Sequence, residues 1–571
     1  MEAAEQQPEA AEGASTSEGT TETSSDTSDT GDTSDTSDTS DTSDTKETPG
    51  DAKETASDAK ETRAGPFPTR SPVDGSELPA VEPTDPADLP AIVLRAREAQ
   101  KAWGELAPRD RADAIVKVKR RLLSRAEEIA TLVRMECGKP IEEAALAEVL
   151  PNADLIDYWT SSIEELLEGT TLDLDPLAYP GKLGRVHRDP RGVVGLISPW
   201  NYPVAIPLRT IVPALLAGNA VVFKPSEITP RSGALVASLF DGLIPTGLLE
   251  IVQGGGDVGA ALIDAGIDVC VFTGSVATGR KIAVQCAERL IPCSLELGGK
   301  DAAIVLADAN LERTANGLLW GAFTNAGQSC ASIERVYVEK PIADKLIERV
   351  VALAKELRPG IDTAVITTEK QCAIVRRHLE QAVACGAKVL TGGAPEEGSL
   401  AFAPTVVKLT EEDTPLLNEE TFGPILPIVV VDSEEQAIAR ANASRFGLTT
   451  SIWTKRINHA HTIARRLRSG VVTINNHGFT AALPDAPWTG TGESGFGITN
   501  SPHALGELTR PRFILEDRSR SKRELWWYPY TPVLRTIAFA MARARGGAGF
   551  FGRIAAVFQL MAALPKRLLG G

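Results

Sequence analysis

The stretch Phe323-Thr324-Asn325-Ala326-Gly327-Gln328-Ser329-Cys330 carries a cysteine on a Gly-Gln turn. Thirty-four positions earlier the chain reads Glu296-Leu297-Gly298-Gly299-Lys300. Both segments contain glycine, which allows the backbone to approach a ligand closely. A thiol nucleophile and a carboxylate base are the groups that covalent catalysis followed by hydrolysis requires. The sequence therefore predicts an enzyme that uses Cys330 as its nucleophile.

Charge is spread unevenly along the 571 residues. The net charge is −17, but residues 1–64 carry −14, residues 518–571 carry +9 and the body between them carries −12. With 43% hydrophobic residues, a chain of this length buries a large core and divides into more than one domain. An acidic body argues against non-specific binding to nucleic acid, so no such partner is expected.

Cysteine usage indicates a reducing compartment. The seven cysteines (137, 270, 286, 293, 330, 372 and 385) include no Cys-x-x-Cys pair, and the six histidines are scattered. Neither a disulfide framework nor a metal site is expected. Because the N-terminus lacks a basic start followed by an apolar stretch, no secretory signal is expected either. We predict a cytoplasmic protein, with a peripheral position on the inner face of a membrane as the alternative.

Residues 1–64 form an acidic tract rich in Ser, Asp and Thr, in which Ser-Asp-Thr repeats from Asp26 to Thr45. Such a composition cannot bury enough apolar surface to offset the entropy of ordering, so we expect disorder. A solubilising linker is the favoured interpretation, and a phosphorylation or docking tail is the other.

Short apolar strands alternate with helices in two successive series, after a helical entry region over residues 91–148. This pattern is typical of a mostly parallel sheet with helices on both faces. We therefore predict an α/β fold with two doubly wound lobes and a cleft between them. The first series has strands at 193–197, 220–223, 249–252, 269–272 and 294–297 and helices at 204–217 and 232–240; the second has strands at 335–339, 388–391, 427–431 and 471–475 and a helix at 342–357; a further strand is expected at 183–188.

Further motifs give a family resemblance. They are Ser198-Pro199-Trp200-Asn201-Tyr202-Pro203, Phe223-Lys224-Pro225-Ser226-Glu227, Phe272-Thr273-Gly274-Ser275 and Glu419-Glu420-Thr421-Phe422-Gly423-Pro424. With the cysteine and glutamate segments, in this order, they resemble the aldehyde dehydrogenase superfamily from about residue 73 to about residue 516. Within it, the chain is most similar to the group that includes diapolycopene-dialdehyde dehydrogenase, which acts on apolar polyene aldehydes.

The resemblance implies a domain organisation and an assembly. It implies an NAD-binding domain over 65–296, a catalytic thiol domain over 297–480, and a return to the NAD-binding domain over 481–516. It also implies a small β oligomerisation arm built from strands near 172–188 and from 510–516. A homodimer or homotetramer is therefore expected.

The same resemblance assigns three catalytic roles. Cys330 attacks the aldehyde to give a thiohemiacetal, which loses hydride to a nicotinamide and becomes a thioester. Asn201, together with the backbone N–H of Cys330, stabilises the oxyanion. Glu296 is the general base that activates water against the thioester. A glutamate at this position favours hydrolysis over transfer of the acyl group to coenzyme A, which remains a minor alternative.

NAD is the expected cofactor, with NADP as the alternative. Lys224 and Glu227 follow a strand at the edge where parallel sheets bind ligands, and a carboxylate there accepts ribose hydroxyls and repels a 2'-phosphate. Gly274, Ser275 and Gly279 lie between a strand and a helix, which suits a pyrophosphate at a helix N-terminus. The expected cofactor-binding set is Ser198, Trp200, Lys224, Glu227, Gly274, Ser275, Gly279, Leu297, Gly298, Glu420 and Phe422.

Three segments need separate interpretation. Gly254-Gly255-Gly256-Asp257-Val258-Gly259 fits a dinucleotide motif, but the usual acid about twenty residues later is absent, so we interpret it as a turn into a helix. Residues 484–497 and 362–367 depart from the family pattern, the first in the loop that the resemblance places at the substrate entrance. We expect neither departure to contact the catalytic set.

Residues 517–571 form a basic amphipathic extension with the run Trp526-Trp527-Tyr528-Pro529-Tyr530. Its apolar stretches are shorter than the ~18 residues needed to span a bilayer. Association with a membrane surface through 526–569 is one interpretation, and packing on the enzyme itself is the other. A membrane-held enzyme suits an apolar or long-chain aldehyde. The alternatives are a small semialdehyde such as succinate semialdehyde, and a membrane-associated binding or scaffold protein with little turnover.

Overall fold

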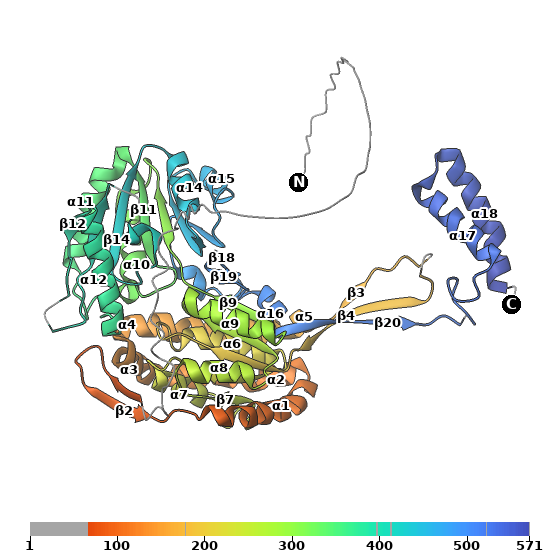
Figure 1. Cartoon of the computed structure of the whole chain (residues 1–571), viewed down its shortest axis with the longest axis horizontal. Coiled ribbons are helices and arrows are strands. Elements are labelled where there is room, and N and C mark those ends of the chain that lie inside the picture. Colours follow the sequence, from red (N-terminus) through yellow and green to blue (C-terminus); the bar gives the residue numbers. More distant parts are fainter. Residues whose placement is uncertain (1–66, 177–178, 396–397, 411–413, 521, 570–571) are drawn as a thin grey trace, which may run out of the picture. The chain divides into compact units, whose positions relative to one another are not determined.

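The computed structural model describes residues 67–569 except 177–178, 396–397, 411–413 and 521. The prediction for the acidic tail at 1–64 lies outside these residues. Within them, no helix is both long enough and apolar enough to cross a membrane. The helices and strands are shown in Figure 1.

A six-stranded sheet is built from the first predicted series of strands. Its order is β19-β9-β8-β5-β6-β7, and all neighbours are parallel except β19 with β9. Every residue of β5 and β6 is buried, which explains their continuous apolar sequences. The strands are β5 (Val193–Ile197), β6 (Ala220–Lys224), β7 (Leu249–Ile251), β8 (Val269–Thr273), β9 (Cys293–Glu296) and β19 (Gly495–Phe496), and the helices among them are α6 (Ala205–Leu216), α7 (Pro230–Ser238), α8 (Gly256–Asp264) and α9 (Val276–Glu288).

The helical entry region packs into the same core as this sheet. Its helices continue past the predicted end at residue 148, because the apolar periodicity runs on through Ile156, Trp159 and Ile163, all buried. The elements are β1 (Phe67–Arg70), β2 (Glu77–Val81), α1 (Leu89–Glu105), α2 (Pro108–Ser124), α3 (Ala126–Cys137), α4 (Ile141–Ala144), the π-helical turn Ala145–Val149 and α5 (Leu150–Leu167).

A seven-stranded sheet forms the second lobe, in the order β12-β13-β14-β11-β10-β16-β17. Both faces are covered, since Ile304 belongs to one hydrophobic cluster and its neighbours Ala303 and Val305 to another. The strands are β10 (Asp301–Val305), β11 (Ile333–Glu339), β12 (Lys388–Thr391), β13 (Thr405–Leu409), β14 (Ile425–Val431), β16 (Thr449–Trp453) and β17 (Val471–Ile474), with helices α10 (Leu311–Phe323), α11 (Lys340–Glu356), α12 (Glu369–Ala384), α14 (Glu434–Asn442) and α15 (Ile457–Ala464).

The expectation of parallel strands is wrong at one edge of this sheet. Strand β12 pairs antiparallel with β13. The described part of the connection between the two strands contains no helix, and a return in the parallel direction usually needs a helical crossover. The strands β10, β13 and β16, which the sequence pattern did not identify, complete the sheet between those that it did.

A three-stranded antiparallel sheet forms the arm, in the order β20-β4-β3. Its strands are β3 (Thr170–Leu172), β4 (Lys182–Pro190) and β20 (Thr509–Asp517). The register runs from Thr509 opposite Pro190 to Asp517 opposite Lys182, so segments more than three hundred residues apart pair along their whole length. Beyond Thr509 every residue of β20 is exposed.

Residues 481–516 touch both lobes before they reach the arm. Strand β18 (Thr491–Gly492) pairs with β15 (Phe446–Gly447), and β19 then joins the six-stranded sheet. The glycine-rich segment at 254–259 forms a turn into α8, as predicted, with Gly254 at φ +156°. After β20 come two helices, α17 (Pro532–Ala542) and α18 (Phe550–Leu569), which pack against each other.

Candidate active site

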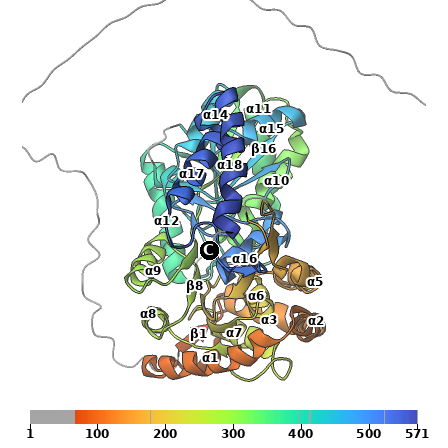
Figure 2. The same ribbon diagram turned by 90° about the vertical axis from the view of Figure 1, so that its right-hand side faces the viewer.

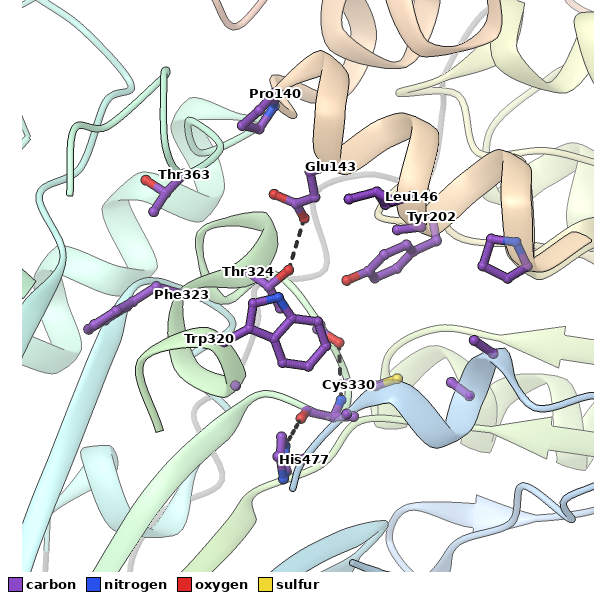
Figure 3. Close-up of a pocket in the computed structure, with 18 of the residues that line it drawn as sticks. Pro140, Glu143, Leu146, Tyr202, Trp320, Phe323, Thr324, Cys330, Thr363 and His477 are labelled. Atoms are coloured by element: carbon purple, nitrogen blue, oxygen red, sulfur yellow. Dashed lines mark hydrogen bonds between the residues drawn. The ribbon is translucent and has the colours of Figure 1, made fainter. Parts of the chain in front are cut away.

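Cys330 follows a strained turn at the end of α10. Asn325 and Ala326 both have left-handed backbone angles, with φ of 50° and 53°, which non-glycine residues rarely adopt. The Glu143 carboxylate accepts hydrogen bonds from the Asn325 amide at 2.7 Å and from the Thr324 hydroxyl at 3.1 Å, as Figure 3 shows for the second contact. Glu143 thus holds the turn that presents the nucleophile.

Gln328, two residues before the nucleophile, fixes this turn to a neighbouring loop. Its side-chain oxygen accepts from the Thr367 amide at 2.8 Å, and its amide donates to the Val365 carbonyl at 3.1 Å. Residues 362–367 thus support a neighbour of Cys330, and that they do not touch the catalytic set itself stays a prediction. A buried amide needs partners for all its polar atoms, and this loop supplies them.

Two glycines let the glutamate segment approach the nucleophile. A Cβ on Gly299 would lie 2.2 Å from the carbonyl oxygen of Cys330, and one on Gly298 would lie 2.2 Å from Oε2 of Glu420. Both distances are far below van der Waals contact. Gly299 is therefore required by backbone packing at the site, and Gly298 leaves room for the Glu420 carboxylate.

The predicted oxyanion donor, Asn201, lies beside the nucleophile turn. Its Nδ2 donates one hydrogen bond, to the Gln328 carbonyl at 3.1 Å, so its second N–H remains available. Its own carbonyl accepts from Lys139 Nζ at 2.6 Å and from Asn325 Nδ2 at 3.1 Å. Lys139 in turn is paired with Glu148, and both side chains are fully buried.

The sequence patterns did not reveal Lys139, Glu143 or Glu148. A weak signal exists, because Glu143 and Glu148 interrupt the apolar helical run from Ile141 to Leu150, where a buried charge needs a partner. That partner lies in a distant segment, so only the folded chain identifies it. Glu148 also accepts from the amides of Val204 and Ala205 and so positions the start of α6.

The candidate base, Glu296, ends strand β9 and lines the same cavity as Cys330. Burial raises its pKa to about 7, against the opposing effects of a 2.5 Å hydrogen bond from the Thr499 hydroxyl and of the nearby Arg209 guanidinium. A carboxyl with this pKa changes its protonation state near neutral pH, as a general base should.

Burial also raises the pKa of the Cys330 thiol, and the negative charge of Glu296 adds to the effect. Arg209 acts in the opposite direction. Cys330, the predicted nucleophile, is therefore a thiol at neutral pH. Nearby His477 donates from Nε2 to the Ala331 carbonyl at 2.6 Å, and burial lowers its pKa to about 4, so it is neutral and structural.

A cavity of about 820 Å³ opens onto Cys330 and Glu296. Figure 3 shows Cys330 among its lining residues. Trp488 lines it and packs in one small cluster with Cys330 and Ala331. Trp488 lies in the departing segment 484–497, so this segment lines the cavity, as the resemblance implies, but the expectation that it avoids the catalytic set is wrong. The apolar wall consists of Leu146, Ala147, Ile206, Leu319, Trp320, Phe323, Leu357, Ile361, Ala481, Ala482 and Trp488.

The predicted cofactor residues of the six-stranded sheet lie at its carboxyl edge. Lys224 ends β6, donates to the Pro225 carbonyl at 3.0 Å and lies 3.7 Å from the exposed carboxylate of Glu227. The hydroxyl of Ser198, just after β5, is buried without a hydrogen-bond partner in the described part of the chain. A buried polar atom in this state indicates a group that a ligand could satisfy.

The glycine-bearing segment after β8 leads into a helix, as predicted. Ser275 caps α9, accepting from the Thr278 amide, and Gly274 immediately precedes it. A Cβ on Gly279 would lie 2.4 Å from Leu297, so the helix packs tightly on the glutamate segment. This arrangement brings Gly274, Ser275, Gly279, Leu297 and Gly298 to one edge of the sheet.

Trp200 and Phe422 face each other across the lobes, with ring centroids 5.5 Å apart in an edge-on arrangement. Glu420 accepts from the Gly299 amide at 3.0 Å. Burial raises the pKa of Glu420 to about 8, and Glu334 contributes.

The sequence patterns also missed a buried support for this segment. Glu334, paired with buried Lys300, accepts from the amides of Thr421 and Phe422, each at 2.8 Å. These contacts hold Phe422 at its positive φ of 52°. Among the described residues, no group of three or more His, Cys, Asp or Glu side chains is placed to hold a metal ion.

Comparison with known proteins agrees with this geometry. Residues 59–514 match the model of the aldehyde dehydrogenase family. The chain belongs to the aldehyde dehydrogenase family. It is therefore an oxidoreductase that acts on aldehydes.

Several named members of the family are similar to this chain. The chain is 37% identical to the 4,4'-diapolycopene aldehyde oxidase of a Methylomonas species, over 81% of this chain and 88% of that protein. It is 35% identical to a putative NADP(+) succinate-semialdehyde dehydrogenase of Mycobacterium ulcerans, over 81% and 92%. The first likeness confirms the subgroup expected from the motifs.

A solved structure confirms the fold. PnpE from Pseudomonas sp. WBC-3, also solved in complex with nicotinamide adenine dinucleotide, shares 33% identity with a TM-score of 0.77, covering 81% of this chain and 96% of that one. The expected aldehyde dehydrogenase-like α/β architecture is thus present.

In this aldehyde dehydrogenase we expect Arg209→Met to shift the pH dependence of turnover to higher pH. Removing the cation removes a charge that lowers the pKa of Glu296, so less of the base is ionised at neutral pH. Activity at pH 7 should fall roughly threefold to tenfold. The kcat–pH profile measures the shift, and Arg209→Lys should retain most of the wild-type profile. An unchanged profile in Arg209→Met would contradict this assignment.

Proposed function

We propose that the protein oxidises an apolar or long-chain aldehyde to the carboxylic acid, with NAD as the electron acceptor. The observation that supports this most directly is Cys330, with Glu296 beside it, on a large cavity of mainly apolar wall. The family supports aldehyde oxidation, and the cavity supports the choice of substrate class.

The residues of this chain divide the reaction into two steps. The Cys330 sulfur attacks the aldehyde carbon while its proton passes to a base, and the free N–H of Asn201 and the backbone N–H of Cys330 stabilise the oxyanion. Bound NAD supplies the acceptor of the hydride whose loss turns the thiohemiacetal into a thioester. Glu296 then takes a proton from water, which attacks the thioester, and the carbon–sulfur bond breaks to release the acid.

The carboxyl edge of the six-stranded sheet suits a dinucleotide. Glu227 offers an exposed carboxylate for the ribose hydroxyls, and the N-terminus of α9 after Gly274 suits a pyrophosphate. The unpartnered hydroxyl of Ser198 lies at the same edge. Trp200 and Phe422 would contact the nicotinamide end, next to Glu420. These residues therefore fit the cofactor that the motifs suggest.

The rim of the cavity supports an apolar substrate. Leu146, Trp320 and Ile361 line it and are exposed by 65%, 51% and 58%. Large apolar side chains left in water at the mouth of a cavity are a favourable surface for an alkyl or polyene chain. A relative named diapolycopene aldehyde oxidase agrees with this class.

A specific observation favours a second candidate, a short aldehyde that carries a carboxylate. Arg209 lines the cavity, where burial lowers its pKa and, among nearby charges, that of Glu296 opposes this most. A guanidinium in such a position can bind a substrate carboxylate. One relative is named as a putative succinate-semialdehyde dehydrogenase, and this is the alternative that the experiment below must exclude.

The substrate experiment measures NADH formation across acetaldehyde, succinic semialdehyde, decanal and an apolar polyene aldehyde. We expect kcat/KM to rise with apolar chain length by at least about tenfold, because each buried methylene adds ~0.8 kcal/mol. Cys330→Ala should abolish turnover. Glu296→Gln should accumulate the acyl-enzyme, visible by mass spectrometry, because hydrolysis then lacks its base.

Other outcomes would select the alternatives. A preference for succinic semialdehyde that disappears in Arg209→Met would replace the apolar substrate with the charged one. Stimulation by coenzyme A would indicate acyl transfer. No turnover of any aldehyde by the wild type would leave a binding or scaffold role for the fold.

Cofactor choice gives a separate prediction. Glu227→Ser should raise kcat/KM for NADP relative to NAD by roughly tenfold, since removing the carboxylate removes its repulsion of a 2'-phosphate. The ratio is measured with one aldehyde, and Glu250→Ser, on neighbouring β7, serves as the matched control. A wild type that already prefers NADP would refute the proposed preference.

We further propose that the arm joins copies of the chain into a dimer or tetramer. Phe513, Ile514 and Leu515 of β20 are exposed by 53%, 47% and 50%. Three consecutive apolar residues of an exposed strand favour burial against a second copy. Phe513→Asp with Leu515→Asp should lower the mass measured by light scattering to that of the monomer, whereas Leu94→Asp should not. A monomeric wild type would refute the proposal.

A further inference from the structure

The C-terminal extension forms a helical hairpin that buries few of its own apolar side chains. Helices α17 and α18 lie side by side in Figures 1 and 2. The apolar residues buried in the hairpin are Ile537, Ala540, Ala556 and Ala563. Alanines allow the helices to approach closely but cover little area. The large apolar side chains of the extension therefore lie elsewhere on its surface.

Those side chains gather on one face of α18. Positions three or four apart lie on the same face of a helix, since each residue turns it by ~100°. The exposed large residues follow this spacing, while Ala556 and Ala563 lie on the opposite face, against α17. The exposed set is Phe550, Phe551, Ile554, Val557, Phe558 and Met561, each exposed by between 42% and 83%.

The segment before the hairpin adds aromatic side chains with polar ends. Trp526, Trp527, Tyr528 and Tyr530 are all at least 48% exposed. Arg567 donates to the backbone carbonyls of Leu525 and Trp527, which ties this segment to the end of α18. Trp and Tyr have an apolar ring and a polar group, and they are enriched at the boundary between lipid and water.

The positive charge of the extension favours a partner that is both apolar and anionic. Residues 518–571 carry ten basic side chains and one acidic one, Glu524. Glu524 is already paired with Lys182 of β4. On the helical wheel Arg553 and Lys566 flank the two sides of the exposed face of α18, and both are exposed. Cations beside an apolar face can extend toward lipid phosphates while the face inserts among acyl chains.

We propose that the segment 526–530 and the exposed face of α18 bind the surface of an anionic lipid bilayer. Helix α18 lies in the plane of the interface, with its aromatic and aliphatic side chains inserted. Its length and the charge of Arg553 suit this position, and no helix in the described residues is able to span. This binding does not depend on which aldehyde the enzyme oxidises.

The test is sedimentation of the full-length protein with phosphatidylcholine vesicles, with and without phosphatidylglycerol. The wild type should bind the anionic vesicles. Its affinity should be lower for the neutral vesicles, and lower for the anionic vesicles at high salt. The double variant Phe551→Ser with Phe558→Ser should lose about tenfold or more of its affinity, because both rings leave the lipid. Leu94→Ser with Val284→Ser is the matched control, since these exposed apolar residues lie on α1 and α9; it should bind like wild type.

Turnover of a water-soluble aldehyde by the same preparations separates this proposal from the proposed function. Unchanged turnover is expected in both variants, because neither touches the catalytic or cofactor residues. A wild type that does not bind vesicles would overturn the proposal, as would equal binding by the two double variants. A change in oligomeric mass in Phe551→Ser with Phe558→Ser, without vesicle binding by wild type, would assign the face to a second copy of the chain and would also overturn it.

Discussion

The pair of hydrogen bonds from Thr324 and Asn325 to the Glu143 carboxylate is the contact on which the site depends. Left-handed backbone at non-glycine residues costs of order 1–3 kcal/mol each, and it persists only where surrounding contacts enforce it. Here Glu143 enforces it from the entry helices, on the side of the six-stranded sheet, while Gln328 anchors the same turn to residues 365–367. The cysteine is thus fixed relative to both lobes at once.

Burial then sets the chemistry of the fixed groups. The same low-polarity surroundings that raise the pKa of the Cys330 thiol also raise that of Glu296 to about 7, and Arg209 moderates both effects. Glu296, the candidate base, is therefore also the group whose charge most affects the Cys330 thiol.

The two buried ion pairs of the site have a common geometric role. Lys139–Glu148 positions Asn201 and the start of α6, and Lys300–Glu334 positions Thr421 and Phe422. Buried pairs contribute little net stability, because desolvation offsets attraction. Their value here is that each carboxylate has fixed directions in which to accept backbone amides. Loops on opposite sides of the cavity are thereby held in one arrangement.

The sequence by itself determined the α/β class and much of the alternation that builds both sheets, and it supplied Cys330, Glu296 and Asn201 as candidate residues, because these signals are local. A continuous apolar run such as Val193–Ile197 indicates a buried strand whatever the rest of the chain does. The residues of a short motif are neighbours in the sequence, so the motif can be recognised without the fold. The rim of the cavity could not be read this way, since Leu146, Trp320 and Ile361 come from three distant segments.

The tertiary structure alone decided which distant segments meet. It brought Glu143 to Asn325 across 182 positions and Thr499 to Glu296 across 203. It also placed residues 362–367 against Gln328 and Trp488 in one cluster with Cys330, and it set the antiparallel direction of β12. Each of these depends on packing and on the need of buried polar atoms for partners. The partner of a buried polar atom is the group that lies next to it in the folded chain, and spacing along the sequence does not predict which group that is.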